Sequence, residues 1–446
     1  MILKGDVYKV ILTLALPIMI NNLIQTLYDL ADGMYVSELS STHFAATSFV
    51  WPVNFLFISI GIGLSIAGTS ILSQFVGASK FDECKKYASQ LVAISFITSI
   101  VFCAVGFLLT PFIVKAMGAT GELAQYSITY LKISFLGMPF MFLFSNFNSI
   151  MTAQGNTIAP TVLSAISAIV NVVLDPIFIF NLDMGIAGAA WATLIAKAFL
   201  VVCGFWMLVK SSKNMIKISF VNFKFDKQVI NRIVRIAIPS SVGQSGSALG
   251  FMVLNSFIAS YGNATMAAFG MVNRITSLIM QPAGGVGAAL TSIVGQNLGY
   301  GQPERVKESF EKAMKLTIGF SVIGCMILIL KDSAVINIFM RSKDDMEVIN
   351  QGITYLKYIS VSMPLMGIFN IFQGIFQGSG HTKYSMNMEI GRLWFVRLPM
   401  ILLFKYLTNI GPLGIWFSMS FSNLVVCIYG YIVYKKGMWK KPVVKI

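Results

Sequence analysis

The chain has 446 residues, of which 56% are hydrophobic and only 11% are charged, and its mean hydropathy is +0.75. A soluble globular domain carries roughly 25% charged residues, so this composition excludes that class and indicates a polytopic membrane protein. The formal net charge of +15 would suit a nucleic-acid partner, but the positions of the charged residues argue against one.

Runs of about 20 apolar residues predict an all-α integral membrane protein with twelve transmembrane helices. The expected spans lie near residues 10–36, 44–76, 88–109, 127–150, 158–180, 184–209, 232–260, 264–298, 313–331, 352–378, 383–407 and 412–434. The first run is too long and too acidic for a cleavable signal, so we expect it to remain as the first helix.

Lysine and arginine collect on one side of this topology. Of the 33 basic residues, 22 fall at or near the termini and the even-numbered loops, seven fall toward the opposite side, and four lie well inside spans, away from their ends. This bias follows the positive-inside rule and predicts a multi-pass protein of the cell (inner or plasma) membrane with both termini in the cytoplasm. The partners expected from it are membrane lipids, with anionic inner-leaflet lipid beside the basic loops, and no nucleic acid.

The chain repeats itself. At a shift of 222 residues, "LALPIM" (14–19) aligns with "IAIPSS" (236–241), and "TSILSQFVGASK" aligns with "TSIVGQNLGYGQ". At a shift of 225, "YLKISFLGMPF" aligns with "YLKYISVSMPL", so the chain is a tandem duplication of six helices. Because six is even, the two lobes are parallel, and we expect them to enclose a central cleft and to alternate access by rocking.

The repeat and the charge pattern set the expected domains. These are an N-terminal six-helix lobe (1–209), a cytoplasmic inter-lobe linker (210–230), a C-terminal six-helix lobe (231–434) and a basic cytoplasmic tail (435–446). In the linker, alternating Ile218, Phe220, Phe223 and Phe225 are suited to lie on the membrane surface. Glycines in "QPAGGVGAAL" (281–290) permit a close approach of two helices.

A polar stripe runs along the first span. Its members Asn22, Gln25, Asp29 and Asp32 are spaced 3, 4 and 3 apart, which places them on one helical face. A carboxylate at membrane depth costs at least about 2.5 kcal/mol on insertion scales, so we expect a function that offsets this cost.

The fifth span also carries polar residues on one face, Asn171 and Asp175, which are four residues apart. Pro176 has no backbone N–H, so a carbonyl one turn earlier lacks its helical hydrogen bond. The topology puts Asp32, Asp175, Tyr130 and Thr193 at one level in the outer half of the first lobe. Carboxylate, amide and hydroxyl oxygens at one level would suit Na⁺ or a shared proton.

The repeat restricts this site to one lobe. By the shift, Asp29 and Asp32 correspond to Phe251 and Leu254, and Asp175 corresponds to Leu398. The alternative is a structural role, in which the acids pair with a basic residue inside the bundle. Away from their ends, the spans offer few such residues, namely Lys197, Arg274, Arg392 and Arg397.

Methionine and phenylalanine are abundant in the second lobe. Flexible thioethers and ring faces suit varied apolar or cationic guests, although packing or lipid contact explains any single residue as well. The candidate cleft residues are Phe251, Met252, Met271, Arg274, Met280, Met363, Phe369 and Phe372. Glu389 and Arg392, three residues apart, are expected to form an internal ion pair.

Five cysteines without a CxxC spacing indicate neither a disulfide framework nor a metal site, and no cofactor is expected beyond a transported Na⁺ or H⁺. We also expect a monomer that is not an enzyme.

The stretches "LALPIMINNLIQTLYDLADGMYVS", "VNVVLDPIFIF", "GIAGAAWATLIAKA", "GMVNRI" and "FQGSGHT" resemble the multidrug and toxic compound extrusion (MATE) family, in its bacterial and archaeal DinF-like branch. The likeness covers essentially the whole chain. It implies twelve helices in two lobes and export of amphipathic, often cationic small molecules in exchange for Na⁺ or H⁺.

Carried over by motif, the resemblance places the coupling-cation site on Asp32, Asn171, Asp175 and Thr193, which would be the Na⁺ ligands of a sodium-coupled protein. It implies a wider polar cavity that includes Gln25, Tyr130 and Asn148. The chain departs from the family pattern at Asp29, where Asn is frequent, and at Ser145, where a relative can carry Asn. The branch with acids in the seventh and tenth helices is not matched, because the seventh span offers only Gln244, Ser245 and Ser247.

Two alternatives stay open at this point. A lipid-linked oligosaccharide flippase of the same superfamily would need a wide basic cleft, and the spans hold few basic residues. An intramembrane prenyltransferase could use Asp29 and Asp32 as a metal pair, but the spans lack a second acidic motif.

Overall fold

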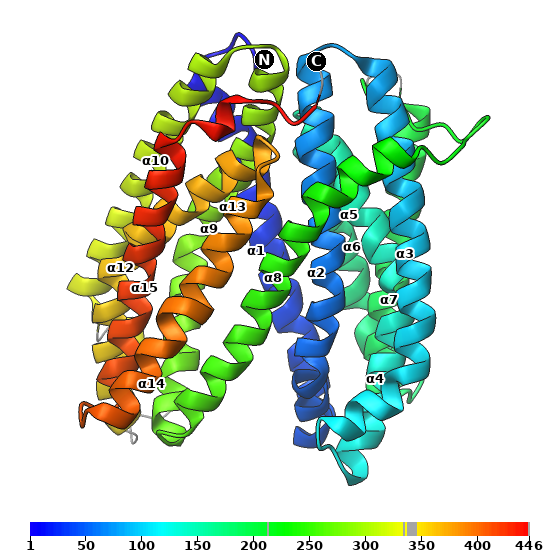
Figure 1. Cartoon of the computed structure of the whole chain (residues 1–446). Coiled ribbons are helices and arrows are strands. Elements are labelled where there is room, and N and C mark those ends of the chain that lie inside the picture. The colour runs from blue at the N-terminus through cyan, green and yellow to red at the C-terminus, as the bar shows by residue number, and fades with distance from the viewer. Residues whose placement is uncertain (212–213, 333–334, 337–345, 445–446) are drawn as a thin grey trace. The chain divides into compact units, whose positions relative to one another are not determined.

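The computed structural model describes residues 1–211, 214–332, 335–336 and 346–444, which form helices joined by short turns, without a strand (Figure 1). Parts of the expected linker (212–213), C-terminal lobe (333–334, 337–345) and tail (445–446) lie outside the described residues. The first half of the chain contains α1 (Val7–Leu39), α2 (Ser41–Gly77), α3 (Phe81–Ala116), α4 (Gly121–Leu136), α5 (Met138–Ala153), α6 (Ile158–Pro176), η1 (Ile177–Asn181) and α7 (Gly185–Lys210). The second half contains α8 (Lys227–Ala259), α9 (Asn263–Gly299), α10 (Pro303–Leu330), α12 (Met346–Gly378), α13 (Thr382–Ile390), η2 (Gly391–Arg397), α14 (Leu398–Leu407), α15 (Leu413–Lys435) and η3 (Met438–Lys440).

Each of the twelve expected spans corresponds to one helical segment. Within the described residues, nine helices are long and apolar enough to cross a membrane, and α4 with α5, bent by 45°, makes a tenth. The other two expected spans are α8, whose first turns carry basic residues, and the run from α13 through η2 to α14, which is broken into shorter pieces. The all-α, twelve-helix prediction is confirmed.

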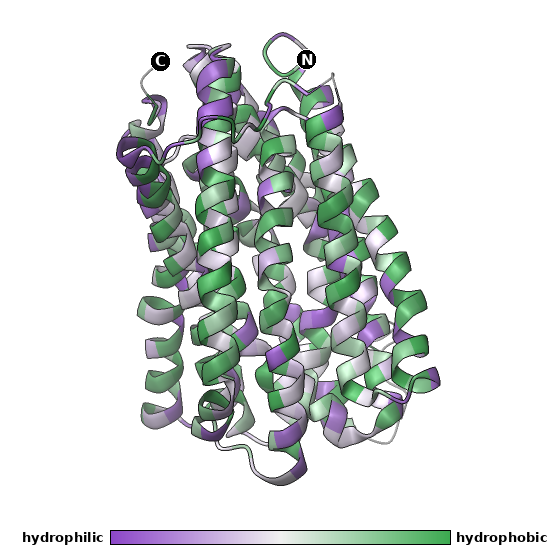
Figure 2. Ribbon diagram, turned by 90° about the vertical axis from the view of Figure 1, so that its right-hand side faces the viewer, coloured by the Kyte–Doolittle hydropathy of each residue, from purple (hydrophilic) through white to green (hydrophobic). Residues whose placement is uncertain are grey.

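Apolar side chains cover the outside of the helices. Figure 2 shows helices that are hydrophobic over most of their length and hydrophilic at many of their ends. Large side chains such as Leu108, Phe112 and Phe395 are more than two-thirds exposed, which in water would be unfavourable and in lipid is not. The chain is therefore built for a bilayer.

The chain folds into two compact units, each containing a segment from the other half of the sequence. The first unit comprises Met1–Met19 and Gly246–Val443, and the second contains Ile20–Ser245. The repeat is a division by sequence, whereas the units are a division by packing, and the two differ at corresponding places in α1 and α8.

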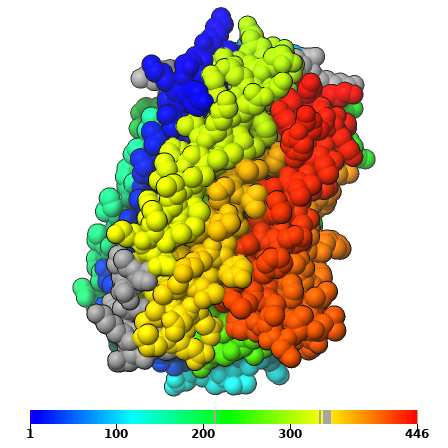
Figure 3. All heavy atoms as spheres, turned by 90° about the vertical axis from the view of Figure 1, so that its left-hand side faces the viewer, coloured from blue at the N-terminus to red at the C-terminus, as the bar shows by residue number. Residues whose placement is uncertain are grey.

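In the first unit, α10, α12 and α15 lie side by side along the face in Figure 3. Val7, Ile11 and Leu14 of α1 are buried in a hydrophobic core with residues of α9, α12 and α15. At the same end, the guanidinium of Arg305 donates to the carbonyl oxygen of Ile2, 3.1 Å away, which fixes the N-terminal segment on the start of α10.

Helices α9 and α12 of this unit touch backbone to backbone. A side chain at Gly287 would collide with the carbonyl oxygen of Asn370, one at Gly374 with that of Gly287, and one at Gly378 with that of Thr291. The close approach predicted from the glycine-rich run at 281–290 is confirmed at Gly287.

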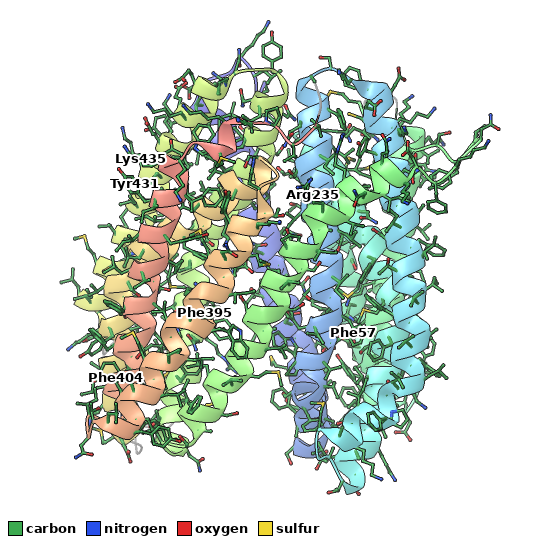
Figure 4. The ribbon with its side chains drawn as sticks, in the orientation of Figure 1. Phe57, Arg235, Phe395, Phe404, Tyr431 and Lys435 are labelled. Carbon is green, nitrogen blue, oxygen red and sulfur yellow. The ribbon has the colours of Figure 1, made fainter. Side chains whose placement is uncertain are left out.

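In the second unit, Phe57 of α2, labelled in Figure 4, packs edge-on against Phe102 and Phe135, with ring centroids 5.4 and 4.9 Å apart. The first part of α8 also belongs here, because the Ser241 hydroxyl donates to the Ile60 carbonyl oxygen at 3.5 Å and Arg232 donates to the Tyr87 hydroxyl at 2.7 Å. The equivalent beginnings of α1 and α8 are therefore exchanged between the two packing units.

Two helices change to wider π-helical turns beside a proline. In the second unit, η1 follows Pro176 directly, and in the first unit η2 ends two residues before Pro399. Proline lacks a backbone N–H, so the hydrogen-bond register of a helix is easily interrupted there. The turn at η1 begins two residues after Asp175, which places a backbone irregularity near a carboxylate.

Candidate functional site

Four helices of the second unit bring the polar candidates together. Asn171 and Asp175 lie one turn apart on α6 and are both 0% exposed. The Asn171 amide donates to Asp175 Oδ1 at 3.3 Å and to Thr193 Oγ1 of α7 at 3.4 Å. The Thr193 hydroxyl in turn lies 3.0 Å from the hydroxyl of Tyr28 on α1. The amide of Asn171 thus joins α6 to α7, and Tyr28 extends the network to α1.

The carboxylates of this site are close enough for their negative charges to repel each other. Asp32, half-buried on α1, acts on Asp175 as a like charge. The phenol of Tyr130 on α4 interacts with Asp29, Asp32 and Asp175 together. The structure therefore brings Asp32, Tyr130 and Asp175 within electrostatic range, and the network of Asn171 adds Thr193.

Three oxygens at the site lack a hydrogen-bond donor. They are Asp32 Oδ1, Asn171 Oδ1 and Asp175 Oδ2, each buried and without a partner in the described part of the chain. A buried oxygen without a donor costs about 1–3 kcal/mol, and more when it is charged. Such oxygens are acceptors for a cation or a proton.

Lys197 is the cationic group of this region. It lies one turn beyond Thr193 on α7 and attracts Asp29 and Asp32, although it makes no direct ion pair with them in the described residues. Lys197 and Met141 line both of two cavities, of about 110 and 40 Å³. The smaller cavity also contacts Tyr130, Thr193 and Asn54.

The remaining polar candidates lie at the margin of the site. Gln25 lines the larger cavity and donates to Asp29 Oδ1 at 2.8 Å, and both side chains are exposed. Asn22 is half-buried and accepts a bond from Thr26 through its backbone. Asn148 of α5 accepts from Thr152 at 3.3 Å, a bond within its own helix. Within the described residues, no hydrogen bond joins the side chain of Asn22 or Asn148 to Asp29, Asp32 or Asp175.

The donor set consists of carboxylate, amide and hydroxyl oxygens. No group of three or more His, Cys, Asp or Glu residues suited to a metal ion occurs within the described residues. Soft and borderline metals favour thiolate and imidazole, whereas hard cations favour oxygen. The site is thus chemically suited to a hard monovalent cation or a proton.

Sequence reasoning did not assign Tyr28, Asn54 and Lys197 to the site. Tyr28 lies three residues after Gln25 and four before Asp32, so the spacing of the polar stripe includes it. Lys197 follows Thr193 by four residues, which puts both on one face of α7. Asn54 had no such signal, because its position depends on how α2 packs.

The substrate candidates fall into two groups in the first unit. Met280, Met363, Phe369 and Phe372 are buried in hydrophobic cores, with exposed fractions between 0% and 9%. These four side chains pack inside the unit and expose little surface, which agrees with the alternative that they serve packing. Phe251, Met252 and Arg274 are exposed, and Met271 is half-buried.

Two arginines of the first unit contact aromatic or neutral polar groups. The guanidinium of Arg392 lies 4.4 Å from the centre of the Phe369 ring, and Arg392 attracts Glu389 electrostatically. The ion pair expected between Arg392 and Glu389 stays a prediction. Arg397 is 3% exposed and donates to Ser422 at 3.0 Å and to Asn423 at 3.3 Å. The unit that lacks Asp29, Asp32 and Asp175 therefore contains one buried cationic group, Arg397, and one half-buried cationic group, Arg392.

Comparison with known proteins identifies the family. The MatE family model matches residues 17–177 and 239–403. The chain is 27% identical over 439 residues to the probable multidrug resistance protein YpnP of Bacillus subtilis, covering 98% of this chain and 97% of that one. It is 24% identical over 437 residues to an FAD transporter of Shewanella oneidensis, covering 96% and 95% of the two chains. A crystal structure of a MATE protein in complex with MaL6 superposes with a TM-score of 0.93 at 26% identity, over 98% of this chain and 97% of that one. Because the family model covers most of the sequence and both six-helix repeats, this chain belongs to the MatE family of multidrug efflux transporters, which are transporters and not enzymes.

Proposed function

We propose that the protein is a cation-coupled antiporter, in which Na⁺ or H⁺ entering at Asp32 and Asp175 drives the export of amphipathic, often cationic small molecules. The observation that carries this proposal is the set of buried acceptor oxygens of Asp32, Asn171 and Asp175 without hydrogen-bond donors. A cation or proton among these oxygens offsets the cost of burying them.

The direction of transport follows from the charge pattern and the membrane potential. The basic residues favour cytoplasmic termini in the cell membrane, which puts Asp32 and Asp175 nearer the outer surface. One inward charge driven by 100 mV contributes about 2.3 kcal/mol, and a tenfold ion gradient contributes about 1.4 kcal/mol more. Together these terms sustain an accumulation ratio of roughly several hundredfold for an exported compound without net charge. A monovalent cation that moves outward in 1:1 exchange cancels the potential term, which leaves a ratio of about tenfold from the ion gradient.

The proposed cycle couples entry of the cation to export of the compound through one site. The outward-open protein loads a cation at Asp32 and Asp175, and this loading favours release of the exported compound. Return to the inward-open form delivers the cation and admits the next compound. The chain acts alone, as a monomer, and needs no cofactor besides the transported ion.

The charge of the exported compound is a separate question, because a relative is named an FAD transporter and FAD is an anion. The half-buried Arg392 and the buried Arg397 make an anionic compound a necessary member of any substrate panel. We assign cationic compounds on the carboxylates of the second unit. The flippase alternative is not favoured, because YpnP is named as a multidrug resistance protein.

The decisive experiment uses purified protein in proteoliposomes, with a Na⁺ gradient and a pH gradient imposed separately. Export of a lipophilic cation and of FAD is measured for the unmodified protein, Asp32→Asn and Asp175→Asn. We expect either substitution to reduce gradient-driven export at least tenfold, because each removes a charged acceptor oxygen. The matched control is Glu38→Gln, an exposed acid near the end of α1, which should retain full activity.

Gradient-driven export that survives in the Asp32→Asn, Asp175→Asn double variant would contradict the coupling site. Export of FAD in place of the cation would leave the coupling site in place and overturn the substrate class.

A further inference from the structure

Another pocket, larger than the two cavities lined by Lys197, lies at the charged end of the second unit, away from the carboxylates. It has a volume of about 610 Å³ and is formed by the first turns of α3, the segment before α8 and the first residue of α8. In Figure 1 this segment lies beside the beginning of α3. Nothing in the proposed antiport uses this pocket.

The pocket carries an excess of positive charge. Lys85, Lys86, Lys224 and Lys227 line it, together with Asp82 and Asp226. Lys86 Nζ lies 2.6 Å from Asp226 Oδ2, so these two charges neutralise each other. The other three lysines are exposed and outnumber Asp82 by two.

The wall of the pocket is fixed by hydrogen bonds. The side-chain amide of Gln90, which is 2% exposed, donates to the Lys224 carbonyl oxygen at 2.6 Å. The backbone N–H of Ser219 donates to the Ser89 hydroxyl at 3.1 Å, and Asn222 adopts a left-handed turn with φ of 54°. These contacts hold the segment against α3, so the backbone that carries Lys224 has a defined position beside Lys85.

The rim of the pocket is apolar. Val221, Phe220 and Phe225 are exposed by 82%, 52% and 53%, and Phe223 contacts both phenylalanine rings at 5.6 and 5.0 Å between centroids. Exposed aromatic side chains beside lysines are typical of a membrane–water interface. A pocket that bound only a soluble anion would have no use for such a rim.

The position along α3 agrees with the level of lipid headgroups. The apolar run of this helix begins near residue 88, within one turn of Lys85 and Lys86. At the end of α7, Lys210 lies 5.0 Å from the ring centre of Trp206, which is 63% exposed. A tryptophan paired with a lysine at a helix end marks the interface region of a bilayer.

We propose that this pocket binds the phosphate headgroup of an anionic membrane phospholipid, with Lys85, Lys224 and Lys227 around the phosphate and the aromatic rim against the acyl chains. The positive charge complements the phosphate, and the exposed rings select a lipid over a soluble phosphate. The proposal is independent of the coupling site.

The test uses native mass spectrometry of the purified full chain with added phosphatidylglycerol or phosphatidylcholine. The Lys85→Gln, Lys224→Gln, Lys227→Gln variant should retain at least tenfold less phosphatidylglycerol than the unmodified protein. Its retention of phosphatidylcholine should be unchanged. The matched control changes the exposed Lys4, Lys307 and Lys315 to glutamine in the first unit, which removes the same charge. An equal loss in this control would overturn the proposal.

A second arm separates lipid from soluble phosphate. The Phe220→Ser, Phe225→Ser variant keeps all the lysines. It should nevertheless bind at least fivefold less phosphatidylglycerol than the unmodified protein, because it lacks the two exposed rings. Inorganic phosphate or glycerol phosphate should not displace the lipid from the unmodified protein at millimolar concentration. Displacement by either compound, or unchanged binding in the serine variant, would show that the site does not recognise a lipid.

Discussion

At the scale of single residues, the polar site was predictable from helical spacing within one helix and much less so between helices. The stripe of α1 and the pair on α6 identified Asp32, Asn171 and Asp175 from intervals of three and four residues. Those intervals say which side chains share a face, but they do not say which neighbouring helix meets that face. Lys197 therefore entered the sequence reasoning only as a basic residue within a span.

Lys197 should tune the cation affinity of the site, because it attracts Asp29 and Asp32 without bonding to them. Changing Lys197 to Gln removes a positive charge that competes with the coupling ion for these carboxylates. We expect the concentration of Na⁺ or H⁺ needed for half-maximal export to fall roughly tenfold, in keeping with the effect of a nearby opposite charge. The measurement is the ion dependence of export in proteoliposomes.

The control for this prediction is Lys132→Gln. Lys132 is also half-buried, but it lies 5.2 Å from the Phe107 ring centre and has no interaction with the site carboxylates in the described structure. A Lys197→Gln protein that needs more coupling ion would show that Lys197 helps to bind the ion.

At the scale of elements, the sequence predicted the twelve spans but not the way some of them are broken. The break between α4 and α5 is at Gly137, with Pro139 in the first turn of α5. Pro176 was expected to free a carbonyl, and the structure adds the π-helical turn η1 directly after it. Such turns depend on packing against a neighbour, which no local pattern reports.

The neighbour of η1 is the beginning of α7, and Gly188 makes this contact possible. A Cβ atom at Gly188 would lie 2.6 Å from the Phe178 carbonyl oxygen and 2.9 Å from the backbone nitrogen of Ile179. Backbone atoms cannot move aside as a flexible side chain can, so Gly188→Ala should cost about 1–3 kcal/mol of stability. We expect a lower melting temperature of the purified protein in detergent, with impaired coupling through the displaced Asp175.

The matched substitution is Gly270→Ala on α9. Gly270 is helical and has open space around its Cβ position, so alanine should be neutral or stabilise the protein by about 0.4–1 kcal/mol. Equal melting temperatures for the two alanine variants would refute the packing argument at Gly188.

The N-terminus of α8 is stabilised by Asp226. Its carboxylate accepts the backbone N–H groups of Gln228 and Val229 at 2.8 and 3.3 Å, and bonds Lys86. Lys86, with these two N–H groups, holds the pKa of Asp226 below its usual range. Because the folded-state pKa is depressed, the stabilisation is present above the unfolded value of about 3.9 and is lost as pH falls through the folded value.

Asp226→Ala should therefore speed amide hydrogen exchange in residues 220–233 at pH 7. Asp226→Asn should speed it less, because asparagine keeps the cap and loses only the ion pair. At pH 3 the difference between the unmodified protein and Asp226→Asn should shrink. Asp82→Asn, in the first turn of α3, serves as the exposed acid control. A difference that grows on acidification would mean that the ionised carboxylate is not the stabilising form.

At the scale of the whole molecule, the sequence revealed the duplication but not the exchange of equivalent segments. Residues 1–19 belong to the packing unit of the second half, and residues 227–245 belong to that of the first half. Aligned repeats show common ancestry and say nothing of which copy a segment packs against. Apolar faces of similar composition, such as those at the starts of α1 and α8, are compatible with either copy.

The glycine contacts between α9 and α12 affect how the protein tolerates change. At Gly287, Gly374 and Gly378, the space that a methyl group would need is already filled by the carbonyl of the opposite helix. In a saturation mutagenesis screen for drug resistance, these three positions should score as intolerant as Asp32 and Asp175 of the proposed coupling site, although they belong to the other packing unit. Intolerance at these glycines would then reflect the close packing of two helices. A folding assay on the same variants would distinguish this packing effect from a direct role in transport.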